Sequence, residues 1–441
     1  MIEDLPVELL LDIFDSLRQQ APSEQWLYEQ PHSDTSAGLA MRDRKRMDGT
    51  SSGQFTHLKA ISCISRRLRA IVLPQLFYNV IWKPRLFPSN VARAEITALL
   101  EFLVTRKLSH CVKTLTVVVD KILADQEDPQ IYENSKDAHL NVLWDQIFSV
   151  IDPLRFTIIA PPAALATLLC RDLNMTDAWS FDAPFHILSF ARSAYGGKGI
   201  GSGQSRSSES GTTALGRSFH CHEQTIRRSA DEVVPSQVEK ERRGKVLASQ
   251  RSNNLEPLVL PRFVDRPWTS ILLNEGSSLA AYRTYEFYHR QPPSVLMALL
   301  GIGKYPNNHR LIRPTIVDLE YVAIFPLASH FQILLSNLPR LEKLFIQITP
   351  HALNPILKNG ELTKNIELAD LWLERDAIYR DIFARLTEAN RDSDWCAPRV
   401  LEVEDTADEE VWDQAIKSIN KAKDNGWWAE RKVSLVRIQR K

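Results

Sequence analysis

Two short segments in the middle of the chain hold residue types that bind phosphates or metal ions. Residues 196–203, GGKGIGSG, place a lysine among glycines, as loops that cradle phosphates do. Such a loop needs Ser or Thr directly after the lysine so that a hydroxyl reaches the metal ion, but Gly199 follows Lys198. We therefore do not predict a nucleotide site here.

The second segment is His220-Cys221-His222-Glu223. Adjacent side chains rarely converge on one tetrahedral ion, and no second pair of ligands stands at zinc-finger spacing. We interpret this segment as a polar linker and predict no bound metal.

The sequence also lacks the common catalytic elements, since it predicts no G-x-S-x-G elbow between a strand and a helix and no H-E-x-x-H helix. Acidic residues cluster at 402–405 and 408–410 without an evident proton-transfer partner. We expect the first cluster at the solvated end of a strand and the second in the first turn of a helix containing Trp412 and Ile416. We therefore predict a protein without catalytic residues or cofactors. An enzyme whose pocket is formed by residues distant in sequence is the alternative.

Charge and cysteine content limit the classes of partner. Fifty-four basic residues balance fifty-four acidic ones in 441 residues, which argues against binding nucleic acid or an anionic membrane through a large field of one sign. Five scattered cysteines favour a reducing compartment over a disulfide framework.

The chain shows no pattern for export or membrane insertion. It opens Met-Ile-Glu-Asp rather than with a basic start and an apolar core, and prolines interrupt the apolar stretch 156–170. We expect an intracellular protein, cytoplasmic or nuclear. The basic runs at 42–46 and 242–245 fit nuclear-import signals and mixed-charge loops equally well.

Two segments are poor in apolar residues and divide the chain. Residues 18–54 contain nine apolar residues, and residues 196–256 contain fourteen out of sixty-one. Neither has a helical or strand period, so neither buries enough surface to offset the entropy of ordering. We predict mobile insertions there. They leave an N-terminal unit over 1–82 and one further domain in two parts, 83–195 and 257–441.

The N-terminal unit has the pattern of three helices, at 5–17, 58–65 and 66–77. Pro6 suits a first helical position, and Ser65 is placed to cap the third helix. Apolar residues cover more of the first helix than the ~100° stripe that one core requires. We expect the surplus apolar face to pack on the rest of the chain or on a partner.

These helices resemble an F-box. The matching patterns are LPVELLLDIFDSL at 5–17 and LKAISCISRRLRAIVLPQLF at 58–77. The linker of about thirty-seven residues is longer than usual, and Leu68 stands where many F-boxes have Trp. Loop-closure entropy grows by only about 0.6 kcal/mol per doubling of length, so the linker is tolerable.

The resemblance implies a module that binds a Skp-type adaptor and thereby joins a cullin–RING ubiquitin ligase. The alternative is that all the matching residues form the core of one larger domain, and spacing alone does not assign which of them face the adaptor. The residues matching the family's contact pattern are Leu5, Pro6, Leu9, Leu10, Ile13, Ile61, Ile64, Leu68, Leu73 and Phe77.

Beyond residue 83, a helix at 91–106 and a series of apolar strands predict a mixed α/β fold. The strands are expected at 112–119, 155–159, 185–190, 316–322, 341–348, 400–403 and 433–438. Residues 338–346, LPRLEKLFI, resemble one leucine-rich repeat, and Leu319 and Leu344 stand 25 residues apart, within the ~20–29 range of such repeats. Later intervals are longer. We expect an irregular leucine-rich-repeat-like solenoid, with a general α/β domain as the alternative.

A solenoid offers an extended surface for a protein partner. Alternation along the strands suggests the surface residues Lys113, Thr114, Glu320, Lys343 and Gln347. The aromatic-rich segment 267–288 fits the edge of a core better than an interface. Together these features predict the substrate receptor of a ubiquitin ligase that binds an unknown protein substrate. A scaffold that binds the adaptor without supporting ubiquitin transfer is the alternative.

Overall fold

The fold was analysed in a computed structural model. It describes residues 5–17, 24, 27–28, 53–84, 90–119, 129–181, 185–192, 260–304, 307–350, 355–388, 398–404, 417, 427–431 and 434–437. The GGKGIGSG and HCHE segments, the basic runs at 42–46 and 242–245, and the expected helix around Trp412 and Ile416 lie outside the described residues.

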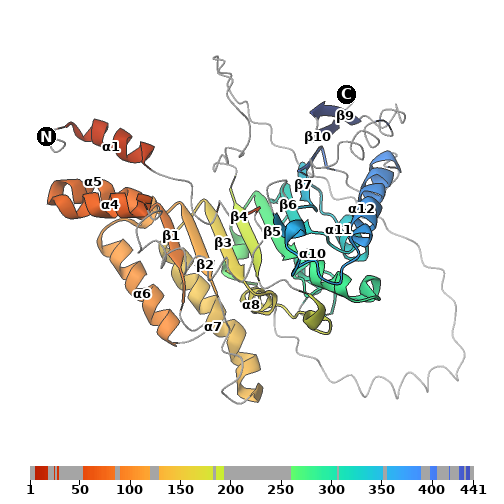
Figure 1. Ribbon diagram of the computed structural model, residues 1–441. Coiled ribbons are helices and arrows are strands. Elements are labelled where there is room, and N and C mark those ends of the chain that lie inside the picture. The colour runs from red at the N-terminus through yellow and green to blue at the C-terminus, as the bar shows by residue number, and fades with distance from the viewer. Residues whose placement is uncertain are drawn as a thin grey trace, which may run out of the picture. The chain divides into compact units, whose positions relative to one another are not determined.

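Ten strands of the described chain form one sheet, and neighbouring strands are almost always consecutive in the sequence (Figure 1). The order across the sheet is β1-β2-β3-β4-β5-β6-β7-β8-β10-β9. The strands are β1 Asn79–Trp82, β2 Thr114–Val118, β3 Arg155–Ala160, β4 His186–Ala191, β5 Ser270–Ser277, β6 Asp318–Ile324, β7 Lys343–Gln347, β8 Val400–Val403, β9 Trp427–Arg431 and β10 Ser434–Arg437.

Most of the sheet is parallel, in two blocks. Strands β1 to β3 are parallel, and so are β5 to β8. Strand β4 runs antiparallel to both of its neighbours and joins the blocks, while β10 and β9 add an antiparallel end. The seven strands expected from the sequence are confirmed. Strands β1, β5 and β9 were not expected.

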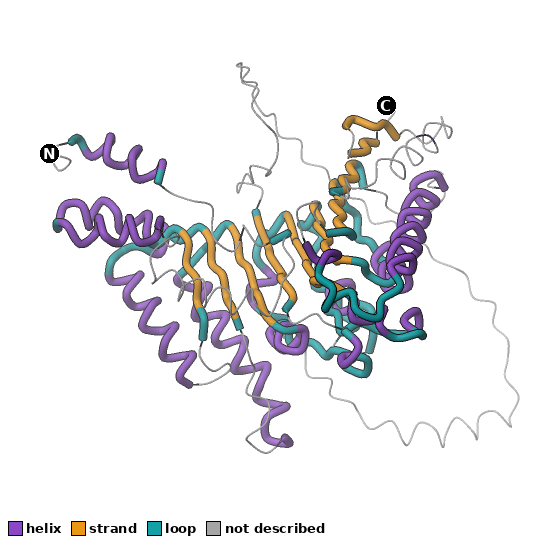
Figure 2. The backbone as a smooth tube through the Cα atoms, in the orientation of Figure 1, coloured by secondary structure: helices purple, strands orange, loops and turns teal. Residues whose placement is uncertain are grey.

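Helices pack against one face of the sheet (Figure 2). The side chains of Leu115 and Val117 on β2 point to this layer, in the same cluster as Ile96 and Leu100 of α6. The helices of the layer are α6 Asn90–Thr105, α7 Pro129–Val150, α8 Pro162–Leu168, α10 Leu296–Leu300, α11 Ala328–Ser336 and α12 Leu368–Glu388. Short 3₁₀ turns lie at Ser109–Cys111, Ala178–Ser180, Arg262–Asp265, Leu279–Arg283, Phe287–His289 and Pro355–Lys358.

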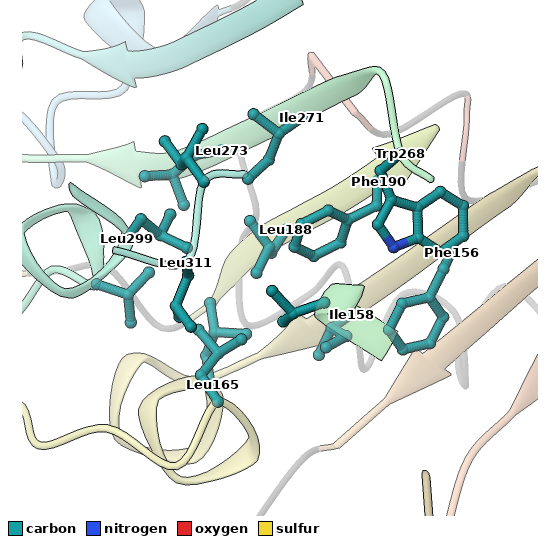
Figure 3. Packing of buried hydrophobic residues seen from close by; sticks show 14 of the residues in the cluster. Phe156, Ile158, Leu165, Leu188, Phe190, Trp268, Ile271, Leu273, Leu299 and Leu311 are labelled. Carbon is teal, nitrogen blue, oxygen red and sulfur yellow. The ribbon is translucent and has the colours of Figure 1, made fainter. Parts of the chain in front are cut away.

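Aromatic side chains fill the middle of this core (Figure 3). Phe156 and Phe190 of the sheet both contact Phe263, with ring centroids 5.1 and 5.8 Å apart. Trp268 is buried and its Nε1 donates to the Phe263 carbonyl at 2.6 Å. The segment 267–288 thus contributes to the core, as expected, although Tyr285 is 93% exposed.

The leucines of residues 338–346 share one interior, as the sequence suggested. Leu341, Leu344 and Ile346 are buried in the core between the sheet and the helices, and Leu338 packs against it. The described part of the chain is therefore a mixed α/β structure with a single sheet. Among the described helices, none combines the length and apolar character required to cross a membrane.

The N-terminal helices form a separate small cluster, which we call the three-helix unit. Its helices are α1 Val7–Ser16, α4 Gly53–Ile64 and α5 Arg66–Leu76. The Oγ of Ser65 accepts the Leu68 backbone N–H at 3.2 Å, which confirms the expected cap of α5. Pro6 lies at the N-cap of α1 rather than at its first helical position.

Candidate interaction surfaces

Helix α1 divides its apolar residues between a buried side and an exposed side. Leu10 and Phe14 are fully buried in the core of the three-helix unit. Leu9 is 50% exposed and Ile13 is 38% exposed, and Val7 beside them is exposed too. The helix therefore presents an apolar surface that the described part of the chain does not cover.

Helices α4 and α5 show the same division. Ile64, at the end of α4, is 63% exposed. Ile61 packs against the core of the three-helix unit, and Leu68 of α5 is buried in it. The Leu68 side chain thus lies in a core that all three helices share.

The remaining residues suggested by the sequence fall into two further groups. Leu73 and Phe77 contact the large core, where the Phe77 ring lies 5.3 Å from the Phe102 ring of α6. These contacts join the three-helix unit to the sheet and its helices. At the start of α1, Leu5 packs on the small core and Pro6 is exposed.

The second surface is the sheet face opposite the helices, which we call the second face. One side chain from each strand from β2 to β8 forms a row in register across it. The row consists of Thr116, Thr157, Ser189, Leu272, Glu320, Phe345 and Glu402. The row is polar from β2 to β4 and alternates between apolar and acidic side chains from β5 to β8.

Four of the five surface residues suggested by the sequence lie on this face. Glu320 and Lys343 are partly exposed, whereas Thr114 and Gln347 are buried. The Lys343 ammonium pairs with Glu402 at 2.6 Å. Lys113 precedes β2, and its backbone N–H donates to the Tyr78 carbonyl.

Part of the linker between α1 and α4 lies on the second face. Leu27 is 3% exposed and packs with Val118, Ile159 and Leu272. The Tyr28 hydroxyl donates to Oε2 of Glu320 at 2.5 Å. Of the segment 18–54, where a mobile insertion is predicted, the structure describes Glu24, Leu27, Tyr28 and the start of α4, and the sheet supplies the apolar surface on which Leu27 packs.

Burial changes the proton affinity of groups on this face. Burial and the neighbouring Glu320 carboxylate raise the pKa of Tyr28 far above its ordinary value, so its hydroxyl stays protonated. Burial also raises the pKa of Asp318, against the opposing charge of Lys343. The hydroxyl of Tyr28 is therefore a hydrogen-bond donor across the neutral pH range.

A group of buried polar residues lies between the sheet and the helices. The Glu275 carboxylate of β5 accepts hydrogen bonds from the Ser294 hydroxyl and, at 2.6 Å, from the Tyr321 hydroxyl. Nε2 of His330 in α11 lies 2.9 Å from Oε2 of Glu275. All four residues are buried, as is His186 of β4.

The charges of this group are balanced internally. Burial would raise the pKa of Glu275, but the charge and hydrogen bond of His330, together with His186 and Ser294, lower it to about 2. Burial lowers the pKa of His186 to about 4. The donors all converge on one carboxylate, an arrangement that stabilises a buried charge. Among the residues that the structure describes, no three His, Cys, Asp or Glu side chains are arranged to hold a metal ion.

The polar group around Glu275 and the contacts of Tyr28 could not be found from the sequence, because their members lie far apart in it. Glu275, Tyr321 and His330 come from separate elements, and Tyr28 and Glu320 are 292 residues apart. The available signal was weak: two polar residues, Asn274 and Glu275, directly after the apolar run Ile271-Leu272-Leu273 of a strand that was not expected.

Comparison of this chain with protein-family models, with curated proteins and with solved structures finds no match.

Proposed function

We propose that this protein is a substrate-receptor subunit of a cullin–RING ubiquitin ligase and acts in the cytoplasm or the nucleus. The three-helix unit binds a Skp-type adaptor, and the sheet domain binds the protein to be modified. One observation carries the proposal: Leu9, Ile13 and Ile64 remain exposed although the unit has a buried core of its own.

The size of the exposed side chains supports a stable contact. Burying a large aliphatic side chain contributes about 1.5–3 kcal/mol relative to leaving it in water. Leu9, Ile13 and Ile64 are 50%, 38% and 63% exposed, and Val7 and Leu11 of α1 are exposed as well. Their burial offsets a substantial part of the entropy that association costs.

The strand order supports a receptor built as an irregular leucine-rich-repeat-like solenoid. Each strand from β1 to β7 pairs with the next strand in the sequence, and the helices pack against one face. Stacked units of this kind leave the other face free for side chains that vary without disturbing the core. The reversed strand β4 is the main irregularity.

In this proposal the protein performs no bond chemistry itself. It holds a target beside a ubiquitin-charged enzyme and so raises the effective concentration of the target's lysine side chains. The buried polar group around Glu275 stabilises the fold and takes no part in ubiquitin transfer.

The test is a pull-down of the full chain with a purified Skp-type adaptor. Leu9→Asp combined with Ile13→Asp places two charges on the exposed side of α1 and is expected to abolish adaptor recovery. The matched control is Val104→Asp combined with Val142→Asp, because these valines are similarly exposed, at 55% and 54%, on α6 and α7. The control is expected to recover as much adaptor as the unmodified chain.

Circular dichroism of the variants separates loss of binding from loss of fold. Equal adaptor recovery by both variants, or recovery by neither variant nor the unmodified chain, contradicts the proposal. A reconstituted ligase reaction then distinguishes a receptor from a scaffold. A scaffold binds the adaptor but transfers no ubiquitin to any protein that the sheet domain captures.

A further inference from the structure

The linker contacts on the second face begin with an ion pair. Oε1 of Glu24 lies 3.4 Å from Nε of Arg155 on β3, and both side chains are largely buried. The same guanidinium donates from Nη1 to the Ser189 hydroxyl at 3.2 Å, and Ser189 in turn shares a hydrogen bond with Thr157. The sheet thus fixes the orientation of the arginine that receives the linker's carboxylate.

Three residues later, Leu27 fills an apolar site in the middle of the face. The site is formed by side chains from four adjacent strands and from the residue before β4. They are Val118, Ile159, Phe185, Ile187 and Leu272, and each is at most 7% exposed when Leu27 is in place. A leucine side chain therefore completes a surface that would otherwise expose apolar groups on a polar face.

The backbone of the linker is held as well. Nδ2 of Asn274 donates to the Leu27 carbonyl at 2.8 Å. The other end of this amide is occupied, because Oδ1 of Asn274 accepts the Gly276 backbone N–H at 2.9 Å. The turn at Gly276, with φ of +72°, thus directs the donor end of Asn274 toward the bound segment.

Tyr28 makes the last contacts. Its ring meets the Phe345 ring edge to face, with centroids 5.4 Å apart, and its hydroxyl donates to Glu320. The segment therefore contacts the sheet from Val118 on β2 to Phe345 on β7. A negative charge, an aliphatic side chain, a backbone carbonyl and an aromatic hydroxyl are each matched by a complementary group.

We propose that the second face is a binding site for a peptide with the pattern Glu-x-x-Leu-Tyr, and that Glu24, Leu27 and Tyr28 of the chain itself occupy it until a target protein supplies that pattern. The inference deepens the proposed function, because it assigns the class of target sequence to the receptor domain. The site is specific: a carboxylate faces Arg155, and a hydroxyl donor rather than an acceptor faces Glu320.

Glu24, Leu27 and Tyr28 belong to the same chain as the sheet, and this explains how they compete with a separate peptide for the site. A segment in the same chain as its site acts at an effective concentration that reaches the millimolar range. A free peptide of the same sequence therefore binds poorly while the linker segment is in place. Weakening the segment, without changing the sheet, is expected to open the site.

The test uses a fluorescein-labelled peptide with the sequence of residues 21–31, APSEQWLYEQP, and the full chain without adaptor. Leu27→Asp in the chain removes the internal occupant and is expected to strengthen peptide binding at least ~10-fold over the unmodified chain, measured by fluorescence anisotropy. Glu24→Gln combined with Tyr28→Phe is a milder opening variant that removes no apolar volume, and it is expected to give a smaller gain.

A charge exchange identifies the binding surface. Arg155→Glu added to Leu27→Asp is expected to lower peptide affinity at least ~10-fold, and a peptide with Lys in place of Glu24 is expected to regain affinity for that variant. Arg262→Glu is the matched control, since Arg262 is 65% exposed and pairs with Asp145 of α7 on the helix-covered side. It is expected to leave peptide binding unchanged.

The inference is overturned if neither opening variant binds the peptide more tightly than the unmodified chain does. It is equally overturned if Arg155→Glu and Arg262→Glu give the same affinity. Because no adaptor is present, failure here leaves adaptor recovery unaffected, and loss of adaptor recovery leaves peptide binding unaffected.

Discussion

The hydroxyl of Tyr321 donates a hydrogen bond to Oε2 of Glu275, 2.6 Å away, between the sheet and the helices. Neither side chain has access to solvent water as an alternative partner, since Tyr321 is fully buried and Glu275 is 8% exposed. The contact therefore contributes to the balance of charge and hydrogen bonding that keeps a carboxylate ionised inside the protein.

Replacing Tyr321 with Phe is expected to lower the free energy of unfolding by about 1.5–3 kcal/mol, the range for a hydrogen bond to a charged group. The change removes the donor and keeps the ring, so packing is preserved. The measurement is urea denaturation at pH 7. Tyr285→Phe is the control, because Tyr285 is 93% exposed, and it should change the free energy by no more than about 0.5 kcal/mol. Equal effects at the two positions would contradict the assigned role of the contact.

The stability of the protein is expected to decline in acid in two stages. Burial holds the pKa of His186 at about 4, below its ordinary 6.5, and the surrounding partners hold that of Glu275 at about 2, below its ordinary 4.5. For each group, at pH values between its folded and its unfolded pKa, the unfolded chain binds more protons than the folded protein does. The free energy of unfolding therefore falls as the pH falls through that range. The His186 contribution is complete above pH 6.5 and is lost toward pH 4. The Glu275 contribution is lost between about pH 4.5 and 2.

One pKa unit corresponds to about 1.4 kcal/mol, so each group accounts for a loss on the order of 3 kcal/mol. Denaturation midpoints between pH 8 and 4 measure the first stage. His186→Gln removes the titrating ring and should flatten the profile between pH 6.5 and 4 relative to the unmodified chain. A profile with the same slope in that variant would show that other groups carry the dependence.

Gly301 is expected to tolerate no side chain. It follows α10 with φ of +75°, and a Cβ placed there would lie 2.6 Å from the backbone nitrogen of Arg310. We expect Gly301→Ala to lower the free energy of unfolding by at least about 2 kcal/mol, because both the backbone conformation and the space oppose it. Thermal unfolding measures the loss. Gly360→Ala, where nothing lies within 4 Å of the added carbon, should leave stability unchanged or slightly raise it.

Local patterns in the sequence predicted much of the fold. Apolar runs such as 155–159 and the leucines of 338–346 identified strands, since a strand buried on the core side needs such side chains. The Ser65 cap identified the start of α5, because its hydroxyl satisfies an otherwise unpaired N–H. Both signals lie within a few residues, and that is the reason they could be recognised.

Features that depend on distant residues could not be predicted in this way. Strand β5 ends in Asn274-Glu275-Gly276, which has the composition of a loop, and only partners on other elements explain why these polar residues are buried. Likewise, Leu27 has no apolar period around it, and its burial depends on the finished sheet. Which residues of α1 are buried and which are exposed could not be predicted either, because this depends on where α5 packs against α1.

Neighbouring leucines of α1 provide the sharpest test of that division. Leu10 is fully buried in the three-helix unit, whereas Leu9 is 50% exposed. We expect Leu10→Ala to destabilise the unit by about 2–5 kcal/mol, through lost burial and the cavity that remains. Leu9→Ala should change its stability by no more than about 0.5 kcal/mol. Hydrogen exchange of α5, followed by mass spectrometry, measures the stability of the unit itself. Faster exchange in the Leu9 variant than in the Leu10 variant would contradict the division, because it would mean that the exposed side of α1 is packed against the protein itself and is not free for a partner.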